Sequence, residues 1–141
     1  GEWGPATNVR EAIEVLGAER IGHGVRVLED DEVTALAAER GTIFEVCVTS
    51  NYQSGVVPNL GRHPLASMLN QGLKCTINTD DPSVSRITLS HEYHMACDEL
   101  EIPFDVLKGT ILTAAEAAFL PEAERTQLVA SLRGELTGMH K

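Results

Sequence analysis

Apolar residues recur along the chain with two spacings, that of a helix and that of a strand. Helical spacing predicts helices over residues 8–16, 30–40, 64–71, 89–100, 103–120 and 121–134. Runs of β-branched and apolar residues predict strands over residues 20–25, 42–48 and 73–78. Strands therefore alternate with helices up to residue 78, and the pattern beyond Pro82 is helical.

The residues between these elements predict where they begin and end. Asn8 is expected to cap the first helix, because Glu11 follows three residues later. Leu16 is expected on the apolar face of this helix, and Gly17 ends it. The stretch 49–62 is rich in Asn, Ser, Gly and Pro and is predicted to be turns and loop.

This order of elements predicts the α/β fold class. Strands that alternate with helices form a parallel sheet built of βαβ units. Three strands fit either a small doubly wound sheet or one part of an eight-stranded barrel, and periodicity does not distinguish the two. A complete barrel needs about 250 residues, more than the 141 of this chain.

The composition argues against two classes of partner. The formal net charge is −10 at pH 7, whereas nucleic-acid binding needs a basic surface to neutralise phosphate. No apolar run approaches the roughly 18 residues needed to span a bilayer. We therefore expect neither a nucleic-acid partner nor a membrane. The first residue is Gly1 and not methionine, so the chain is expected to begin inside a longer protein.

The three cysteines, Cys47, Cys75 and Cys97, are an odd number at wide spacing. That count fits neither a disulfide framework nor a zinc site made of thiolates. Cys47 and Cys75 lie in apolar runs and are expected to be buried, unreactive thiols. A reducing cytoplasm is the expected location.

Unusual polar residues follow two of the predicted strands, where the chemistry of parallel α/β proteins collects. His23 stands between two glycines after the first strand, which lets a ligand approach the imidazole closely. Asp80 and Asp81 follow the third strand, and adjacent carboxylates repel unless a metal ion or a strong donor offsets their charge. Glu2 lies in a turn-like sequence that could end another strand.

Each of these features also has a structural interpretation. A histidine after a strand is more often structural than catalytic, and Asp81 could cap the helix that follows. Ser50 and Asn51 follow the second strand, and a pocket lining and a loop turn fit them equally well. Together, at successive strand ends of one sheet, the polar residues favour a hydrolytic metal site.

Other histidines are interpreted structurally. The segment His91-Glu92-Tyr93-His94 lacks the spacing of the zinc-protease motif and is predicted to be a solvated helical face. His63, before Pro64, is predicted to position the start of a helix. His140 is expected to lie in a frayed tail.

Four motifs follow one another in a fixed order along the chain. They are Arg20-Ile21-Gly22-His23-Gly24, Glu45-Val46-Cys47 leading to Thr49-Ser50-Asn51, His63-Pro64, and Asn78-Thr79-Asp80-Asp81-Pro82. In order and spacing they resemble the second half of the adenosine deaminase family. The opening Gly1-Glu2 is similar to the end of that family's His-Ala-Gly-Glu motif. One departure is Val48, where the family commonly has proline, in a position expected to shape the turn after the strand.

The resemblance implies a zinc-dependent (β/α)8 TIM barrel of the amidohydrolase type, which converts adenosine and water to inosine and ammonia. Residues 1–141 would form the C-terminal part of its catalytic domain, from the end of strand five through strand eight and the following helices. Asp80 is the one zinc ligand of the family that the chain contains, and the others are expected in a missing N-terminal part. The isolated chain is therefore expected to be weakly stable and inactive.

The resemblance also implies a role for each site residue. Zinc lowers the pKa of a bound water toward about 7, and Asp80 would be a ligand of that ion. His23 would take the proton of this water and then hold the hydroxide against C6 of the purine. Glu2 would give a proton to ring N1, Asp81 would hydrogen-bond N7, and Gly1 would contact the substrate.

Two alternatives remain open. One keeps the chemistry and changes the substrate to adenine, AMP or another adenosine-containing metabolite such as aminodeoxyfutalosine. The other is a non-catalytic α/β domain that only binds a ligand. The four intact polar residues of the predicted site speak against this second alternative.

Overall fold

The structure is a computed structural model that describes residues 1–139, so the predicted tail residue His140 lies outside the described residues. Its central element is a three-stranded parallel sheet in the order β1-β2-β3. The strands are β1 (Arg20–Gly22), β2 (Ile43–Val46) and β3 (Lys74–Ile77). The α/β class and the three parallel strands predicted from the sequence are confirmed.

Helices account for most of the remaining chain. The α-helices are α1 (Ala6–Glu14), α2 (Asp31–Arg40), α3 (Val48–Gln53), α4 (Leu65–Asn70), α5 (Pro82–Ser85), α6 (Leu89–His94), α7 (Phe104–Glu116) and α8 (Glu122–Thr137). Two 3₁₀ turns, η1 (Val27–Glu29) and η2 (Leu60–Arg62), and a π-helical segment, η3 (Met95–Glu99), complete the set. None of the helices within residues 1–139 is long and apolar enough to cross a bilayer.

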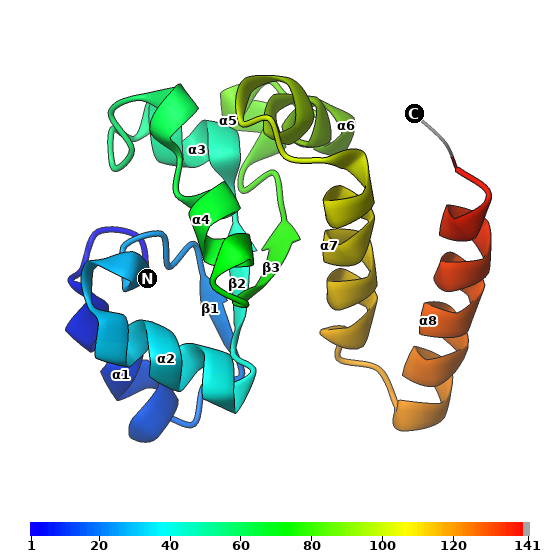
Figure 1. Cartoon of the computed structure of the whole chain (residues 1–141), viewed down its shortest axis with the longest axis horizontal. Coiled ribbons are helices and arrows are strands. Elements are labelled where there is room, and N and C mark those ends of the chain that lie inside the picture. The colour runs from blue at the N-terminus through cyan, green and yellow to red at the C-terminus, as the bar shows by residue number, and fades with distance from the viewer. Residues whose placement is uncertain (140–141) are drawn as a thin grey trace.

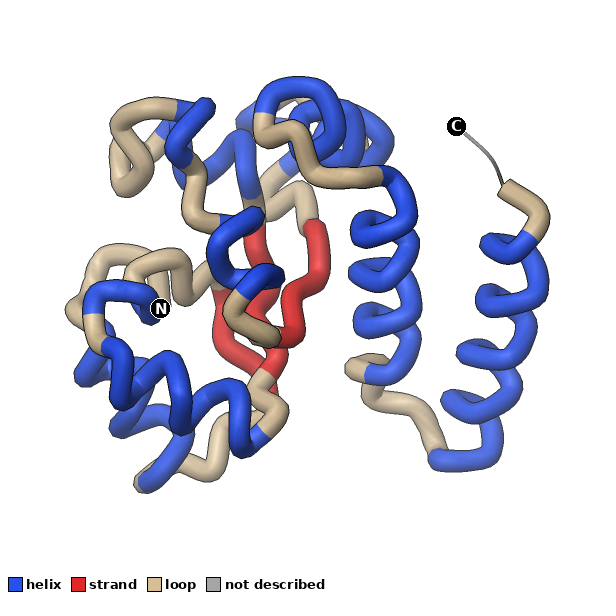
Figure 2. The backbone as a smooth tube through the Cα atoms, viewed as in Figure 1, coloured by secondary structure: helices blue, strands red, loops and turns tan. Residues whose placement is uncertain are grey.

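The helices divide into those that lie beside the sheet and those that lie at the carboxyl ends of its strands. Helices α2 and α4 connect successive strands, and α7 packs beside β3 with α8 on its far side (Figure 1). Helices α3, α5 and α6 gather at the carboxyl ends of the strands, opposite the end near the α7–α8 connection (Figure 2). The residues that follow each strand are therefore close to one another.

The central strand is anchored by alternating side chains. Phe44 and Val46 are fully buried, as are Leu65 and Met68 of α4, whereas Glu45 on the other face of β2 is half-buried. Burial of such side chains contributes about 1.5–3 kcal/mol each to stability. This packing fixes the direction of β2 and hence the place where α3 begins.

The first helix differs from the prediction at both ends. It begins at Ala6, and the carbonyl of Pro5 accepts the N–H of Asn8 at 3.0 Å, so the predicted Asn8 cap is wrong. Proline has its φ fixed near the helical value and starts the first turn without a side-chain cap. The helix ends at Glu14, and Leu16 is 76% exposed, so its predicted place on the apolar face is also wrong.

The first strand is shorter than predicted and ends at Gly22. His23 and Gly24 have φ angles of 59° and 69°, in the left-handed region, which ends the extended backbone. A Cβ at Gly24 would lie 2.3 Å from Cδ1 of Phe44. Gly24 therefore makes room for the core, and the prediction that it makes room for a ligand is wrong. Gly22, by contrast, borders an open cavity.

The predicted loop 49–62 is wrong in its first part, because Val48–Gln53 form α3. Val48 and Asn51 are three residues apart on this helix, and both are fully buried. Val48 occupies the first helical position, a place that proline also favours. The departure from the Cys-Pro of the resembling family therefore falls at a helix start, where both residues are acceptable.

Candidate active site

Backbone contacts bring the first residues of the chain to the end of β1. The carbonyl of Gly1 accepts the N–H of Gly24 at 3.1 Å. A Cβ at position 1 would lie 2.5 Å from the carbonyl oxygen of Gly22, so a glycine is required for this close approach. Glu2 is thereby held beside the carboxyl end of β1.

His23 and Asp80 approach each other from two different strand ends. Nε2 of His23 lies 3.9 Å from Oδ2 of Asp80. Both residues have a φ of 59°, which side chains other than glycine adopt at a cost. Strained backbone of this kind collects at functional sites, where the surrounding structure maintains it. Arg86 and Glu101 have similar φ angles, so it is the facing of the His23 and Asp80 side chains, together with their backbone, that marks this place as a candidate site.

The backbone of His23 gives a first prediction. Ordinarily glycine is less stabilising than alanine, but at a left-handed position alanine is strained by about 1–2 kcal/mol. We therefore expect the His23→Gly protein to be more stable than the His23→Ala protein by about 1 kcal/mol in urea unfolding. Ala35→Gly, in the exposed middle of α2, is the control and should lose about 1 kcal/mol. A His23→Ala protein at least as stable as the glycine variant would contradict the strain.

Helix α3 supplies the contacts that connect the predicted site residues. Oγ of Ser50 donates to Oδ2 of Asp80 at 2.7 Å. Nδ2 of Asn51 lies 3.0 Å from Nδ1 of His23 and 3.5 Å from Oε1 of Glu2. Of the two interpretations left open for Ser50 and Asn51, the loop turn is wrong, and both side chains face the site.

Glu2 is held by two donors on the same oxygen. In addition to Asn51, Oγ of Ser54 donates to Oε1 of Glu2 at 2.8 Å. Ser54 is the C-cap residue of α3, so both donors come from one short helix and its end. The structure thus brings Glu2, His23 and Asp80 together, places Asn51 among them, and adds Ser54, which the sequence did not single out.

Asp81 has different partners from its neighbour Asp80. Its Oδ1 accepts the N–H groups of Ser83 and Val84, both at 3.1 Å, and so caps α5. The structural interpretation of Asp81 is therefore confirmed, and its contact with a substrate stays a prediction. The two adjacent carboxylates divide between a helix cap and the candidate site.

His63 connects the candidate site to the start of α4. It is 4% exposed, and its Nδ1 accepts the N–H of Leu65 at 3.1 Å, so the prediction that it positions a helix start is confirmed. Its Nε2 lies 3.3 Å from Oδ1 of Asn51. Burial lowers the pKa of His63 from 6.5 to about 4, so the ring is neutral at pH 7.

The lowered pKa of His63 predicts a loss of stability in acid. The unfolded chain takes up a proton on this histidine below pH 6.5, whereas the folded chain does so only near pH 4. Stability is therefore expected to fall with pH by about 3 kcal/mol in total through this window, measured by urea unfolding at successive pH values. His63→Gln should flatten the profile, and replacement of the exposed His91 should not. An unchanged profile in His63→Gln would remove His63 as the cause.

Glu92 overturns one prediction. His91 and His94 of the same helix are exposed as expected, but Glu92 is fully buried and not part of a solvated face. Its Oε2 accepts the N–H of Thr49 at 3.2 Å, in the first turn of α3. A buried carboxylate from α6 therefore caps α3, whose own N-cap residue, Cys47, makes no side-chain cap.

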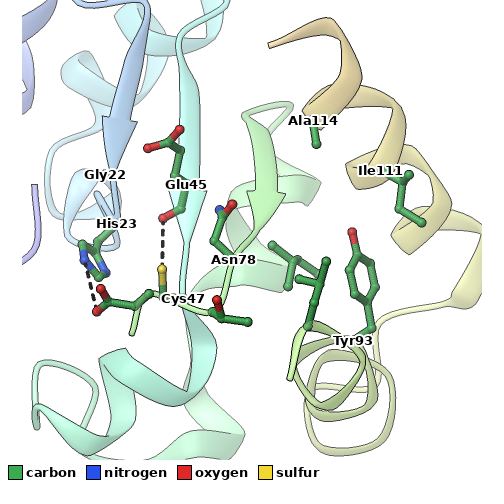
Figure 3. A pocket seen from close by; sticks show the side chains of 12 residues that line it. Gly22, His23, Glu45, Cys47, Asn78, Tyr93, Ile111 and Ala114 are labelled. Atoms are coloured by element: carbon green, nitrogen blue, oxygen red, sulfur yellow. Dashed lines mark hydrogen bonds and ion pairs between the residues drawn. The ribbon is translucent and has the colours of Figure 1, made fainter. Parts of the chain in front are cut away.

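A cavity of about 710 Å³ opens between the sheet and α7. Figure 3 shows His23, Glu45, Cys47 and Asn78 on its sheet side, with Tyr93 and Ile111 opposite. The volume suits a small organic ligand. Burial raises the pKa of the Cys47 thiol to about 12, so it remains protonated and unreactive, as predicted.

Metal-binding groups are few in this part of the molecule. Within residues 1–139, no group of three or more His, Cys, Asp or Glu side chains is placed to hold an ion. At the strand ends, Asp80 and His23 are a pair of such side chains, with Nε2 of His23 3.9 Å from Oδ2 of Asp80. A catalytic zinc generally has three protein ligands, so this chain by itself supplies fewer than such a site needs.

The geometry defines a parallel α/β protein with a polar site at its strand ends, and comparison with known proteins gives the family. The sequence model of the family described as adenosine deaminase matches residues 1–134. The chain belongs to the adenosine deaminase family.

Similar proteins agree with this assignment. The chain is 41% identical to an adenosine deaminase of Erwinia tasmaniensis over 132 residues, which are 94% of this chain and 40% of that protein. It matches the crystal structure of an adenine deaminase from Arthrobacter aurescens with a TM-score of 0.91 and 29% identity, over 98% of this chain and 42% of the other.

A zinc-containing structure is also similar. The amidohydrolase from Burkholderia ambifaria, with bound zinc, has a TM-score of 0.87 and 27% identity over 94% of this chain and 37% of the other. The chain thus spans about 40% of the length of the proteins that it matches.

Proposed function

We propose that this chain is the C-terminal part of the catalytic domain of a hydrolytic purine deaminase that converts adenosine to inosine and ammonia. The observation that carries the proposal is the convergence of Glu2, His23 and Asp80 at the carboxyl ends of the strands. The same three residues are those that the resemblance to the family selected from the sequence. The positive φ angles of His23 and Asp80 are typical of functional sites, and the turnover test below distinguishes a catalytic site from one that only binds a ligand.

The proposed barrel is supported by length and by the position of Gly1. Each similar protein is more than twice as long as the matched part, so a complete (β/α)8 barrel has room for five further strands. The carbonyl of Gly1 accepts the N–H of Gly24, the second residue after β1, where a preceding strand would end. In this proposal β1, β2 and β3 are strands six, seven and eight, and residues 1–141 are one partial domain.

The residues around Asp80 fit one side of a zinc site. Carboxylate oxygen is an accepted zinc donor, and Asp80 borders the cavity. We expect Asp80 to be one ligand and the remaining ligands to come from outside this chain. When bound, the ion would lower the pKa of a water molecule to about 7 and so supply the nucleophile.

The other residues would act on the purine and on the attacking water. The hydrogen bonds from Asn51 and Ser54 both end on Oε1 of Glu2, which leaves Oε2 to face ring N1 and deliver a proton. Nε2 of His23 would hold the attacking oxygen close to C6. Asp81 would hydrogen-bond N7, and Gly1 would contact the ring beside Glu2.

The substrate is tested by a panel. Adenosine is the expected substrate, and the adenine deaminase from Arthrobacter aurescens makes adenine the first alternative. Ammonia release from adenosine, adenine, AMP and aminodeoxyfutalosine, by the complete native protein loaded with zinc, separates these cases. Turnover of adenosine at the highest kcat/KM among the four compounds supports the proposal. A higher kcat/KM for another aminopurine would keep the proposed deamination and change the assigned substrate to that compound. Absence of turnover with all four would favour a binding domain.

A further inference from the structure

We propose that His63 and Asn51 are positioning residues that select the tautomer of His23, so that an N–H of its Nε2 faces Asp80. The hydrogen bonds run in one line from the backbone of Leu65 to the candidate site. The tautomer itself follows from the structure alone. Its effect on turnover rests on the proposed function.

The series of hydrogen bonds begins at a backbone N–H, which can act only as a donor. The backbone N–H of Leu65 can only donate, so Nδ1 of His63 is the acceptor and carries no proton. His63 is buried, and a buried imidazole without a charged partner is neutral. Its single proton is therefore on Nε2, which points at Asn51.

The proton on His63 fixes the orientation of the Asn51 amide. Nε2–H of His63 donates to Oδ1 of Asn51 across 3.3 Å. The opposite orientation would place two donors against each other in a fully buried position. The Asn51 NH₂ group is thereby turned to the site, where its two hydrogens reach Nδ1 of His23 and Oε1 of Glu2.

The orientation of Asn51 in turn selects the state of His23. An amide NH₂ only donates, so Nδ1 of His23 must accept and is unprotonated. The neutral ring then carries its proton on Nε2, the nitrogen 3.9 Å from Oδ2 of Asp80. A ring in this tautomer has an Nε2–H that can donate to a water oxygen beside Asp80. This tautomer is suited to holding the attacking water, and less suited to the proton acceptance that the resemblance to the family implies.

The first test is a spectrum and needs no turnover. Long-range ¹H–¹⁵N correlation of histidine side chains in the complete native protein distinguishes protonated from unprotonated ring nitrogens. For both His63 and His23 we expect a protonated Nε2 and an unprotonated Nδ1. A protonated Nδ1 on His23 in the unmodified protein would overturn the proposal, whatever the activity.

The variants test whether His63 exerts this control at a distance. His63→Gln keeps an acceptor for Leu65 and a donor for Asn51, and should keep the His23 spectrum. His63→Leu removes both and frees the amide to turn, so the Nε2-protonated form of His23 should lose its dominance. In the same variant kcat should fall by about 100-fold with little change in KM.

Other outcomes separate the positioning role from folding and from the proposed function. His91→Gln, on an exposed face of α6, is the control and should change neither spectrum nor kcat. A His63→Leu protein with the unaltered His23 spectrum would overturn the proposal. If the spectra agree with expectation but no aminopurine is turned over, the tautomer selection stands and the proposed function fails.

Discussion

Glu2→Gln is expected to lower deamination by about 10²- to 10⁴-fold while leaving the metal bound. The glutamine keeps the size of the side chain and an oxygen for the donors Asn51 and Ser54, but it has no acidic proton to deliver to the purine ring. The loss should appear in kcat, because the proton is needed as the ring nitrogen gains basicity during the attack. Steady-state kinetics together with metal analysis of the purified variant measures both effects.

The matched control for this prediction is Glu11→Gln. Glu11 lies on the exposed face of α1, away from the candidate site, and its replacement should change kcat by less than a factor of two, within the scatter of surface substitutions. Near-normal turnover in Glu2→Gln would remove Glu2 from the mechanism. Loss of metal in Glu2→Gln would assign Glu2 to the metal site.

Asp80→Ala is expected to remove both the bound zinc and the turnover. In the proposed site Asp80 is a ligand of the zinc ion, and its Oδ2 also accepts a hydrogen bond from the Ser50 hydroxyl. Alanine offers no donor atom to the ion, so the site loses one corner of a tetrahedral arrangement. Zinc content measured after gel filtration should fall well below one ion per chain, and turnover should fall with it.

The backbone of Asp80 requires a second variant. Alanine is strained at a φ of 59°, whereas asparagine tolerates this region as aspartate does. Asp80→Asn should therefore fold normally and still bind zinc more weakly, because it lacks the negative charge. Asp98→Ala, on an exposed position of η3, is the control. Stoichiometric zinc retained in both Asp80 variants would show that the ligand assignment is wrong.

The sequence predicted the sheet and most helices because their cores are apolar and regularly spaced. Phe44 and Val46 alternate in β2, and helix α4 follows Pro64 as expected. Helix α3 was missed because it has only six residues and one of its buried positions is the polar Asn51. Apolar periodicity does not register a buried asparagine, although the i, i+3 spacing from Val48 was present in the sequence.

The sequence predicted the site residues at the strand ends but not the residues that hold them. Glu2, His23 and Asp80 stood out because polar residues at strand ends are unusual and match a known motif. The sequence predicts Glu92 on a solvated face, since a glutamate between exposed histidines gives no sign of burial. Its partner, the N–H of Thr49, is 43 residues away, and only the fold brings the two together.

The most direct test of the proposed deaminase function is the ultraviolet change on conversion of adenosine to inosine by the complete native protein loaded with zinc. We expect rapid conversion that a metal chelator stops and that added zinc restores. No conversion of adenosine or of any other aminopurine, with the fold intact and zinc bound, would contradict the deaminase assignment. The chain would then belong to a domain that binds a ligand without converting it.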